Sequence, residues 1–121
     1  MNAIDRVNIL YESEVISADV KDTVLRVIEW LGERKVGIDS DNGQMFLTHL
    51  AMSLERVCKG EEVDALPDAM MDEVKSSRGY ILALEFIEYM EGILNRKLPE
   101  SEKGYILLHL SILQEKEDQH D

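Results

Sequence analysis

The chain has little of several residue types that mark particular classes of protein. It contains a single cysteine, Cys58, so no intramolecular disulfide can form and no set of thiolates can hold a metal ion. Cys58 stands near the end of a predicted helix, where we expect a packed or half-packed structural thiol in preference to a nucleophile. Basic residues are also few, 13 against 25 acidic ones, which gives a net charge of -12. That charge would repel a phosphate backbone and argues against direct nucleic-acid binding.

Long apolar runs are absent as well. Charged residues interrupt each apolar stretch, so no segment is predicted to span a membrane. The residues at the N-terminus, 1–6, lack the basic start and long apolar run of a signal peptide. We therefore expect a cytoplasmic protein without a membrane anchor. The length of 121 residues, of which 45% are hydrophobic and 31% charged, suits one ordinary globular domain.

The patterns that are present are helical. The sequence has only two prolines, Pro67 and Pro99, and no alternating apolar pattern of useful strand length. We predict an all-α fold with four main helices and one short one, packed as a five-helix bundle of antiparallel helices because the loops are brief. The main helices are expected over residues 18–34, up to Gly60, over 78–95 and from Pro99 to 113, and the short one from Pro67 to 75. Residues 4–11 form a short opening helix or a lead-in.

Capping residues define the predicted ends of these helices. Ser17 is an N-cap candidate, and Asp39, Ser40 and Asp41 are candidates for the helix that ends at Gly60. Gly37 is expected to end the helix over 18–34. We predict a single domain over residues 1–116, followed by a disordered acidic tail over 117–121 that contains His120.

The helix that ends at Gly60 carries a histidine, His49, beside its apolar face. Phe46, Leu47, Leu50, Leu54 and Val57 form one apolar arc on a helical wheel, and His49 lies off the centre of that arc. Arg56 follows two turns later on almost the same line. Such a histidine can reach solvent or a partner, or it can hydrogen-bond a neighbouring helix at the edge of the core. The periodicity alone favours the second interpretation.

The last helix carries another histidine, His109, among apolar neighbours. Tyr105, Ile106, Ile112 and Leu113 surround it on the wheel, and Glu102 lies two turns earlier on nearly the same line. We expect His109 to be more buried than His49. A buried histidine needs hydrogen-bond partners for its ring nitrogens, so this pattern also favours a core residue.

No constellation of residues indicates a common catalytic site. The sequence has no nucleophile elbow, no phosphate-binding glycine loop and no His-Glu-x-x-His pair, so an enzyme is not predicted. The Glu-x-x-His motifs of dinuclear carboxylate sites are missing too, because Phe46 and Ile106 stand three residues before the two histidines. A zinc site made of His49, His109 and a carboxylate is weakly signalled. No cofactor is predicted.

Two blocks of sequence resemble one known family, the PTS regulation domain (PRD). The first block is Phe46-Leu47-Thr48-His49-Leu50, followed by Leu54-Glu55-Arg56-Val57 and Gly60. The second runs from Leu98-Pro99-Glu100-Ser101-Glu102 through Lys103-Gly104-Tyr105-Ile106 to Leu107-Leu108-His109-Leu110. Each block is centred on its histidine, the separation of the blocks fits, and the resemblance extends from about Asp5 to Leu113.

This resemblance implies a function that composition and periodicity do not reveal. PRD modules are helical regulators controlled by the bacterial sugar phosphotransferase system, and their histidines accept phosphoryl groups from phosphorylated HPr or a sugar-specific EIIB protein. By position, His49 and His109 match the two phosphoacceptors, and Arg56 matches a frequent basic position with a supporting electrostatic role. Imidazole suits this chemistry, because it titrates near neutrality and has a nucleophilic nitrogen. Many such modules are homodimers.

The chain departs from familiar members of that family in two ways. Those members carry two modules in tandem with an RNA-binding or DNA-binding effector, whereas this chain accounts for one module. Many also have an acidic residue directly before the first histidine, where this chain has Thr48. We therefore expect a stand-alone module that signals by binding itself or a separate regulator protein in transcriptional or sugar-uptake regulation. The alternatives are a non-phosphorylated interaction module of the same fold and, from another class, a metal-assisted hydrolase.

Overall fold

The computed structural model describes residues 2–118, with side chains up to Glu115, and this part of the chain is helical without any strand. Its six helices are α1 (Ala3–Glu12), α2 (Ala18–Glu33), α3 (Asp41–Lys59), α4 (Asp68–Ser76), α5 (Tyr80–Leu94) and α6 (Glu100–Asp118). The predicted all-α class is confirmed. The predicted count of five is too low, because the opening segment is a helix of 10 residues in addition to the short α4. None of the six is long and apolar enough to cross a lipid bilayer.

The helices gather into two compact units of three. One unit covers Met1–Lys59 and contains α1, α2 and α3, and the other covers Gly60–Asp121 and contains α4, α5 and α6. The single domain over residues 1–116, its disordered tail over 117–121 and the antiparallel arrangement of the whole bundle stay predictions. The helix α6 is described up to Asp118, and residues 119–121, including His120, lie outside the described residues.

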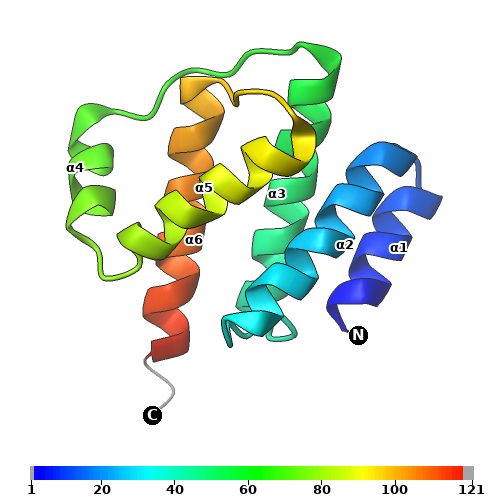
Figure 1. Cartoon of the computed structure of the whole chain (residues 1–121), viewed down its shortest axis with the longest axis horizontal. Helices are drawn as coiled ribbons and strands as arrows, with labels where there is room; N and C mark the ends of the chain where they lie inside the picture. The colour runs from blue at the N-terminus through cyan, green and yellow to red at the C-terminus, as the bar shows by residue number, and fades with distance from the viewer. Residues whose placement is uncertain (1, 119–121) are drawn as a thin grey trace. The chain divides into compact units, whose positions relative to one another are not determined.

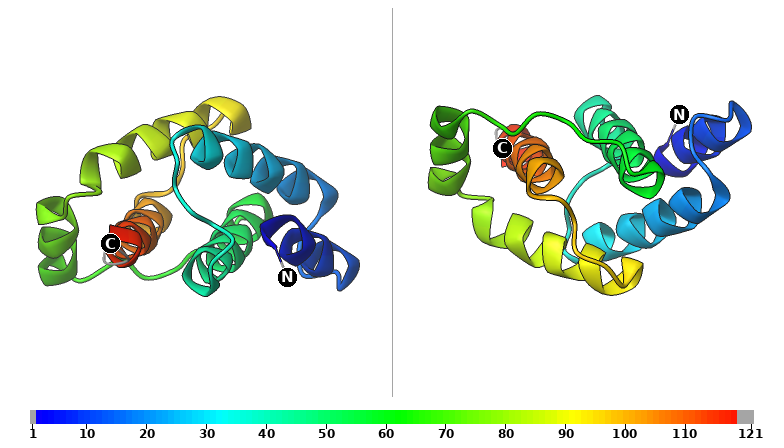
Figure 2. Two further views of the ribbon diagram at one scale, coloured as in Figure 1. Left: turned by 90° about the horizontal axis from the view of Figure 1, so that it is seen from below. Right: turned by 90° about the horizontal axis from the view of Figure 1, so that it is seen from above.

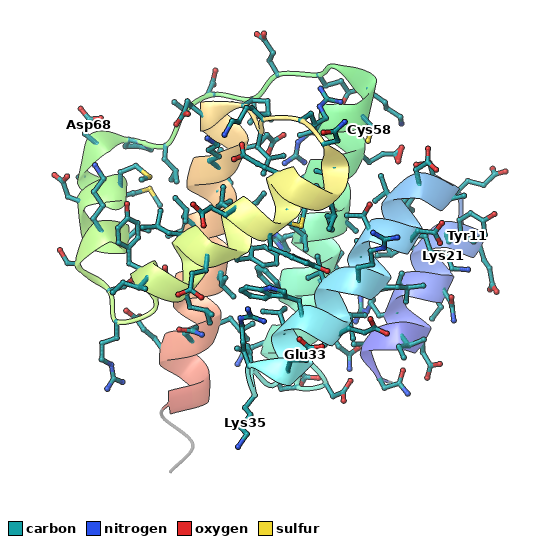
Figure 3. The ribbon with its side chains drawn as sticks, viewed as in Figure 1. Tyr11, Lys21, Glu33, Lys35, Cys58 and Asp68 are labelled. Carbon is teal, nitrogen blue, oxygen red and sulfur yellow. The ribbon has the colours of Figure 1, made fainter. Side chains whose placement is uncertain are left out.

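In the first unit, α1 and α2 run side by side in opposite directions (Figure 1). The turn between them is possible because Glu14 adopts a left-handed conformation with φ 62°, which reverses the chain after α1. The hydroxyl of Ser17 then accepts a hydrogen bond from the backbone N–H of Val20 at 3.4 Å. This confirms Ser17 as the N-cap of α2. Across the hairpin, the ammonium of Lys21 lies 4.5 Å from the ring centroid of Tyr11 (Figure 3).

The ends of α2 and α3 are set by three residues. Gly37 was predicted to end α2, which is wrong: Lys35 adopts the left-handed conformation, with φ 60°, and α2 ends at Glu33. Ser40 caps α3, because its hydroxyl accepts a hydrogen bond from the N–H of Gly43 at 3.1 Å. Gly60 follows the last residue of α3 with φ 73°, as predicted. That conformation carries little steric cost in glycine.

The start of α3 packs closely against the segment that precedes it. A Cβ atom added to Gly43 would lie 2.3 Å from the Cα of Ile38, so only glycine fits there. The carboxylate of Asp39 accepts a hydrogen bond from the N–H of Ala3 at 2.9 Å and so ties this segment to the start of α1. The helix α3 also packs against both α1 and α2 (Figure 2). The buried core of the unit includes Val7, Val20, Val24, Val27, Leu31, Leu47, Leu50, Ala51 and Leu54.

In the second unit, α6 packs against α4 and α5, and α5 crosses it obliquely (Figures 1 and 2). Pro67 is the N-cap residue of α4. The sequence predicts it within the first turn of this helix, so the helix begins one residue later than predicted. Asn95 ends α5 in the left-handed conformation, with φ 54°. The core of this unit includes Leu66, Val74, Ala83, Phe86, Met90, Leu98, Ile106, Leu110 and Leu113.

Candidate functional site

The helix α3 has a buried face and an exposed face. The five residues of the predicted apolar arc are all buried, with exposed fractions between 0% and 4%: Phe46, Leu47, Leu50, Leu54 and Val57. His49 lies outside this arc and is exposed to solvent. The helical wheel therefore predicted correctly that His49 lies beside the buried face of α3. Its side chain is accessible from solution.

A stripe of four residues runs along this exposed side of α3. At 3.6 residues per turn, Met45, His49, Met52 and Arg56 fall within an arc of about 60°. We call these four residues the His49 stripe. Met45 and Met52 are 61% and 45% exposed, and Arg56 is half-buried. The stripe therefore combines one imidazole, two accessible thioethers and one guanidinium.

The polar neighbours of His49 on α3 have other partners. The hydroxyl of Thr48 donates a hydrogen bond to the carbonyl oxygen of Gln44 at 3.0 Å, inside the helix. The carboxylate of Glu55 accepts a hydrogen bond from the N–H of Ser17 at 2.8 Å and lies 4.0 Å from the ammonium of Lys59. Glu55 therefore connects α3 to the start of α2.

His109 has a different environment, on α6 in the second unit. Its side chain is half-buried, whereas Ile106 and Leu113 beside it on the wheel are each 2% exposed. Glu102, two turns earlier, is 1% exposed and is a fully buried carboxyl group. The prediction that His109 is more buried than His49 is confirmed. The two histidines thus belong to different units of the chain and differ in access to solvent.

The second unit also contains an ion cluster that sequence reasoning missed. The carboxylate of Glu91, on α5, accepts a hydrogen bond from the backbone N–H of Leu98 at 2.7 Å. It also lies 3.6 Å from the ammonium of Lys97 and 3.4 Å from that of Lys103. Lys103 in turn lies 3.3 Å from Glu100. The cluster connects the end of α5 to the first turns of α6. Leu98, Glu100 and Lys103, which belong to the second family-like block, therefore have a structural role.

These contacts shift the pKa of two groups. The hydrogen bond from Leu98, followed by the charges of Lys103 and Lys97, lowers the pKa of Glu91 below its ordinary value of 4.5 despite partial desolvation. Partial desolvation lowers the pKa of Lys103, but the pairing with Glu100 and Glu91 outweighs it and raises that pKa overall. Glu91 therefore stabilises the fold at a pH above its unfolded pKa. This contribution is lost as the pH falls through the lowered pKa of the folded state.

An open groove lies beside this cluster. It has a volume of about 780 Å³ and is lined by residues from the segment before α4 and from α4, α5 and α6, among them Leu66, Met71, Ile81, Leu84 and Leu107. Gly104, in the wall of the groove, lets Leu66 pack closely against α6, since an added Cβ there would lie 3.1 Å from a methyl group of Leu66. Among the described residues, no three His, Cys, Asp or Glu side chains form a group that could hold a metal ion.

Known proteins with similar sequences identify the family. Residues 27–112 match the PRD domain family, and this range contains His49, Arg56 and His109. The chain is also 27% identical over 106 residues to the uncharacterized protein YhfY of Escherichia coli (strain K12), an alignment that covers 87% of this chain and 88% of YhfY. No solved structure matches. The family match spans well over half of the chain, and the protein therefore belongs to the PRD domain family, whose members are regulatory modules of the phosphotransferase system.

Proposed function

We propose that this protein is a PRD module that accepts phosphoryl groups on His49, His109 or both. Phosphorylated HPr or an EIIB protein would be the donor, in the cytoplasm. The observation that carries the proposal is the exposure of His49 on α3, inside the region that matches the family. A donor protein can reach this imidazole without any rearrangement of the helix that holds it.

The chemistry requires an unprotonated ring nitrogen. Its lone pair attacks the phosphorus atom of the donor and forms a new P–N bond. The donor's own bond to phosphorus breaks, and the electron pair of that bond returns to the donor atom, which takes up a proton. The other ring nitrogen carries a proton, so the newly phosphorylated ring is positively charged. It releases this proton to water, and charge and atoms balance. Imidazole can perform this step near neutral pH.

The output of the module would be a change in protein binding. A phosphoryl group adds almost two negative charges to a chain whose net charge is already -12. At an interface with a second copy of the chain, or with a separate regulator protein, this added charge repels acidic groups and attracts arginine. We expect sedimentation of the phosphorylated and unphosphorylated forms to differ, or their affinity for the regulator to differ.

Phosphoryl transfer from a reconstituted system tests the proposal. The protein is incubated with phosphoenolpyruvate, enzyme I, HPr and candidate EIIB proteins, and its intact mass is measured at alkaline pH, which preserves phosphohistidine. We expect a phosphoryl adduct on the wild type and none on the double variant His49→Gln and His109→Gln. The double variant is the matched control, because it retains His120, the third histidine of the chain.

Two results would contradict the proposal. If no donor labels the wild type, the non-phosphorylated interaction module of the same fold becomes the better explanation. If the double variant is labelled as well as the wild type, His49 and His109 are not the acceptors. The single variants then assign the adduct to one histidine or to both.

A further inference from the structure

Two exposed methionines flank His49 on the outer side of α3. Met45 lies four residues before the histidine and Met52 three residues after it, so each is about one helical turn away. They are 61% and 45% exposed. Apolar side chains of this size gain free energy when a partner covers them. Their position on both sides of one accessible imidazole is therefore informative about what binds there.

Transfer of a phosphoryl group sets geometric demands on that partner. The attacking nitrogen and the leaving atom must lie in line through phosphorus, and water must be kept away from the reacting group. A protein donor that meets these demands at His49 must cover α3 on both sides of the ring. It thereby covers Met45 and Met52. Methionine suits such a contact, because its flexible and polarizable side chain adapts to the surface it meets.

The charge of the His49 stripe favours a phosphorylated partner. Arg56 lies on the same stripe, one turn beyond Met52, in a chain with a net charge of -12. A phosphoryl group carries nearly two negative charges at neutral pH, so a guanidinium two helical turns from the acceptor complements it through its charge. An unphosphorylated acidic protein would lose this attraction at the reacting centre and would still be repelled by the rest of the chain.

We propose that Met45 and Met52 are the apolar docking contacts for the carrier protein that phosphorylates His49. The carrier would present its phosphoryl-bearing residue within an apolar rim that packs on the two methionines. This inference rests on the proposed function and adds the surface by which the donor is recognised. Because the methionines bind the donor and do not take part in bond making, they affect KM and leave kcat almost unchanged.

The test measures initial rates of adduct formation against donor concentration, in a His109→Gln background. It compares the wild-type stripe with the double variant Met45→Ala and Met52→Ala, using the phosphorylated carrier that labels the wild type. The double variant should raise KM roughly tenfold, as expected for two central apolar contacts, and change kcat less than about twofold. Leucine at both positions should restore most of the binding, because it keeps the apolar area.

Two controls separate docking from other effects. Met70→Ala removes a methionine of similar exposure, 40%, from α4 in the other unit, and should leave KM unchanged. Phosphoramidate, a small donor that makes no protein interface, should phosphorylate the wild type and the double variant at equal rates. A difference with phosphoramidate would mean that the methionines act on the reactivity of His49 and not on docking.

The possible outcomes are distinct. If the carrier labels His49 and the double alanine variant keeps the wild-type KM, the docking surface is wrong while the proposed function stands. The same conclusion follows if Met70→Ala raises KM equally, or if the carrier labels only His109. If no carrier labels the wild type, both the proposed function and this inference fail.

Discussion

Replacing Arg56 by glutamine should weaken phosphoryl transfer to His49 by a modest and salt-dependent factor. The two residues are seven positions apart on α3, so their Cα atoms are separated by about 10 Å along the axis. Side chains on helices generally lean toward the N-terminus, so we take roughly 8 Å as the separation between the guanidinium of Arg56 and a phosphoryl group on His49. That separation is too long for a hydrogen bond, so Arg56 acts through its charge.

Coulomb's law gives the size of this effect. A charge of +1 and a phosphoryl charge of about -2 at roughly 8 Å attract each other by about 1 kcal/mol in a water-like dielectric, since His49 is exposed. This corresponds to roughly a fivefold change in rate at low salt. At physiological ionic strength the Debye length is about 8 Å, which reduces the effect to roughly twofold, and at 1 M salt it should vanish.

The assay compares Arg56→Gln with Arg56→Lys in the His109→Gln background, at three salt concentrations. Lysine keeps the charge and should retain nearly all of the wild-type rate. Two results would refute this reasoning: a loss of transfer rate of more than about fiftyfold that persists in high salt, or a lysine variant that is as slow as the glutamine variant. Either result would indicate a bidentate contact between guanidinium and phosphate. Urea unfolding checks that the half-buried Arg56 can be replaced without loss of the fold.

Two further predictions concern stability, each read from urea unfolding. Gly43→Ala should destabilise the protein by about 1–3 kcal/mol, because its Cβ would meet the backbone of Ile38. Gly32→Ala, a control helix glycine with nothing within 4 Å, should be neutral or stabilise by about 0.5 kcal/mol, and equal effects at both sites would contradict the close approach. Glu91→Gln should lower stability at pH 7, because the charged carboxylate is lost beside two lysines. The difference in unfolding free energy between the wild type and this variant should shrink as the pH falls below 4.5. A difference that grows instead would contradict the lowered pKa of Glu91.

Local sequence signals were enough to predict most helices and to predict which face of α3 is buried. The apolar arc, the capping hydroxyl of Ser17 and the left-handed Gly60 act over a few residues, and each has the predicted role. The relative exposure of His49 and His109 could also be predicted, since a helical wheel carries that information when one face is clearly apolar. The roles of His49, His109 and Arg56 came from the family blocks, and they stay predictions.

Other features depend on contacts that a local pattern does not contain. Lys35, not Gly37, ends α2, because an ordinary residue can occupy the left-handed region when the hydrogen bonds of the turn compensate for the steric cost. Glu91 caps the N–H of Leu98 across a loop, and nothing in the spacing of the two residues indicates that bond. The close approach of Gly43 to Ile38 is likewise a tertiary contact, visible only once α3 is placed against its preceding segment.

The different exposure of the two histidines bears on how a PRD module of this kind could work. His49 is exposed, so a phosphoryl group there would be solvated by water and would change the charge of the surface with little effect on the core. His109 is half-buried beside residues that are 2% exposed, so a phosphoryl group there would have to leave water or displace its apolar neighbours. Phosphorylation of His49 therefore suits control of binding at the surface. Phosphorylation of His109 suits control of the conformation of α6, because the fold must adjust before the added charge can be accommodated.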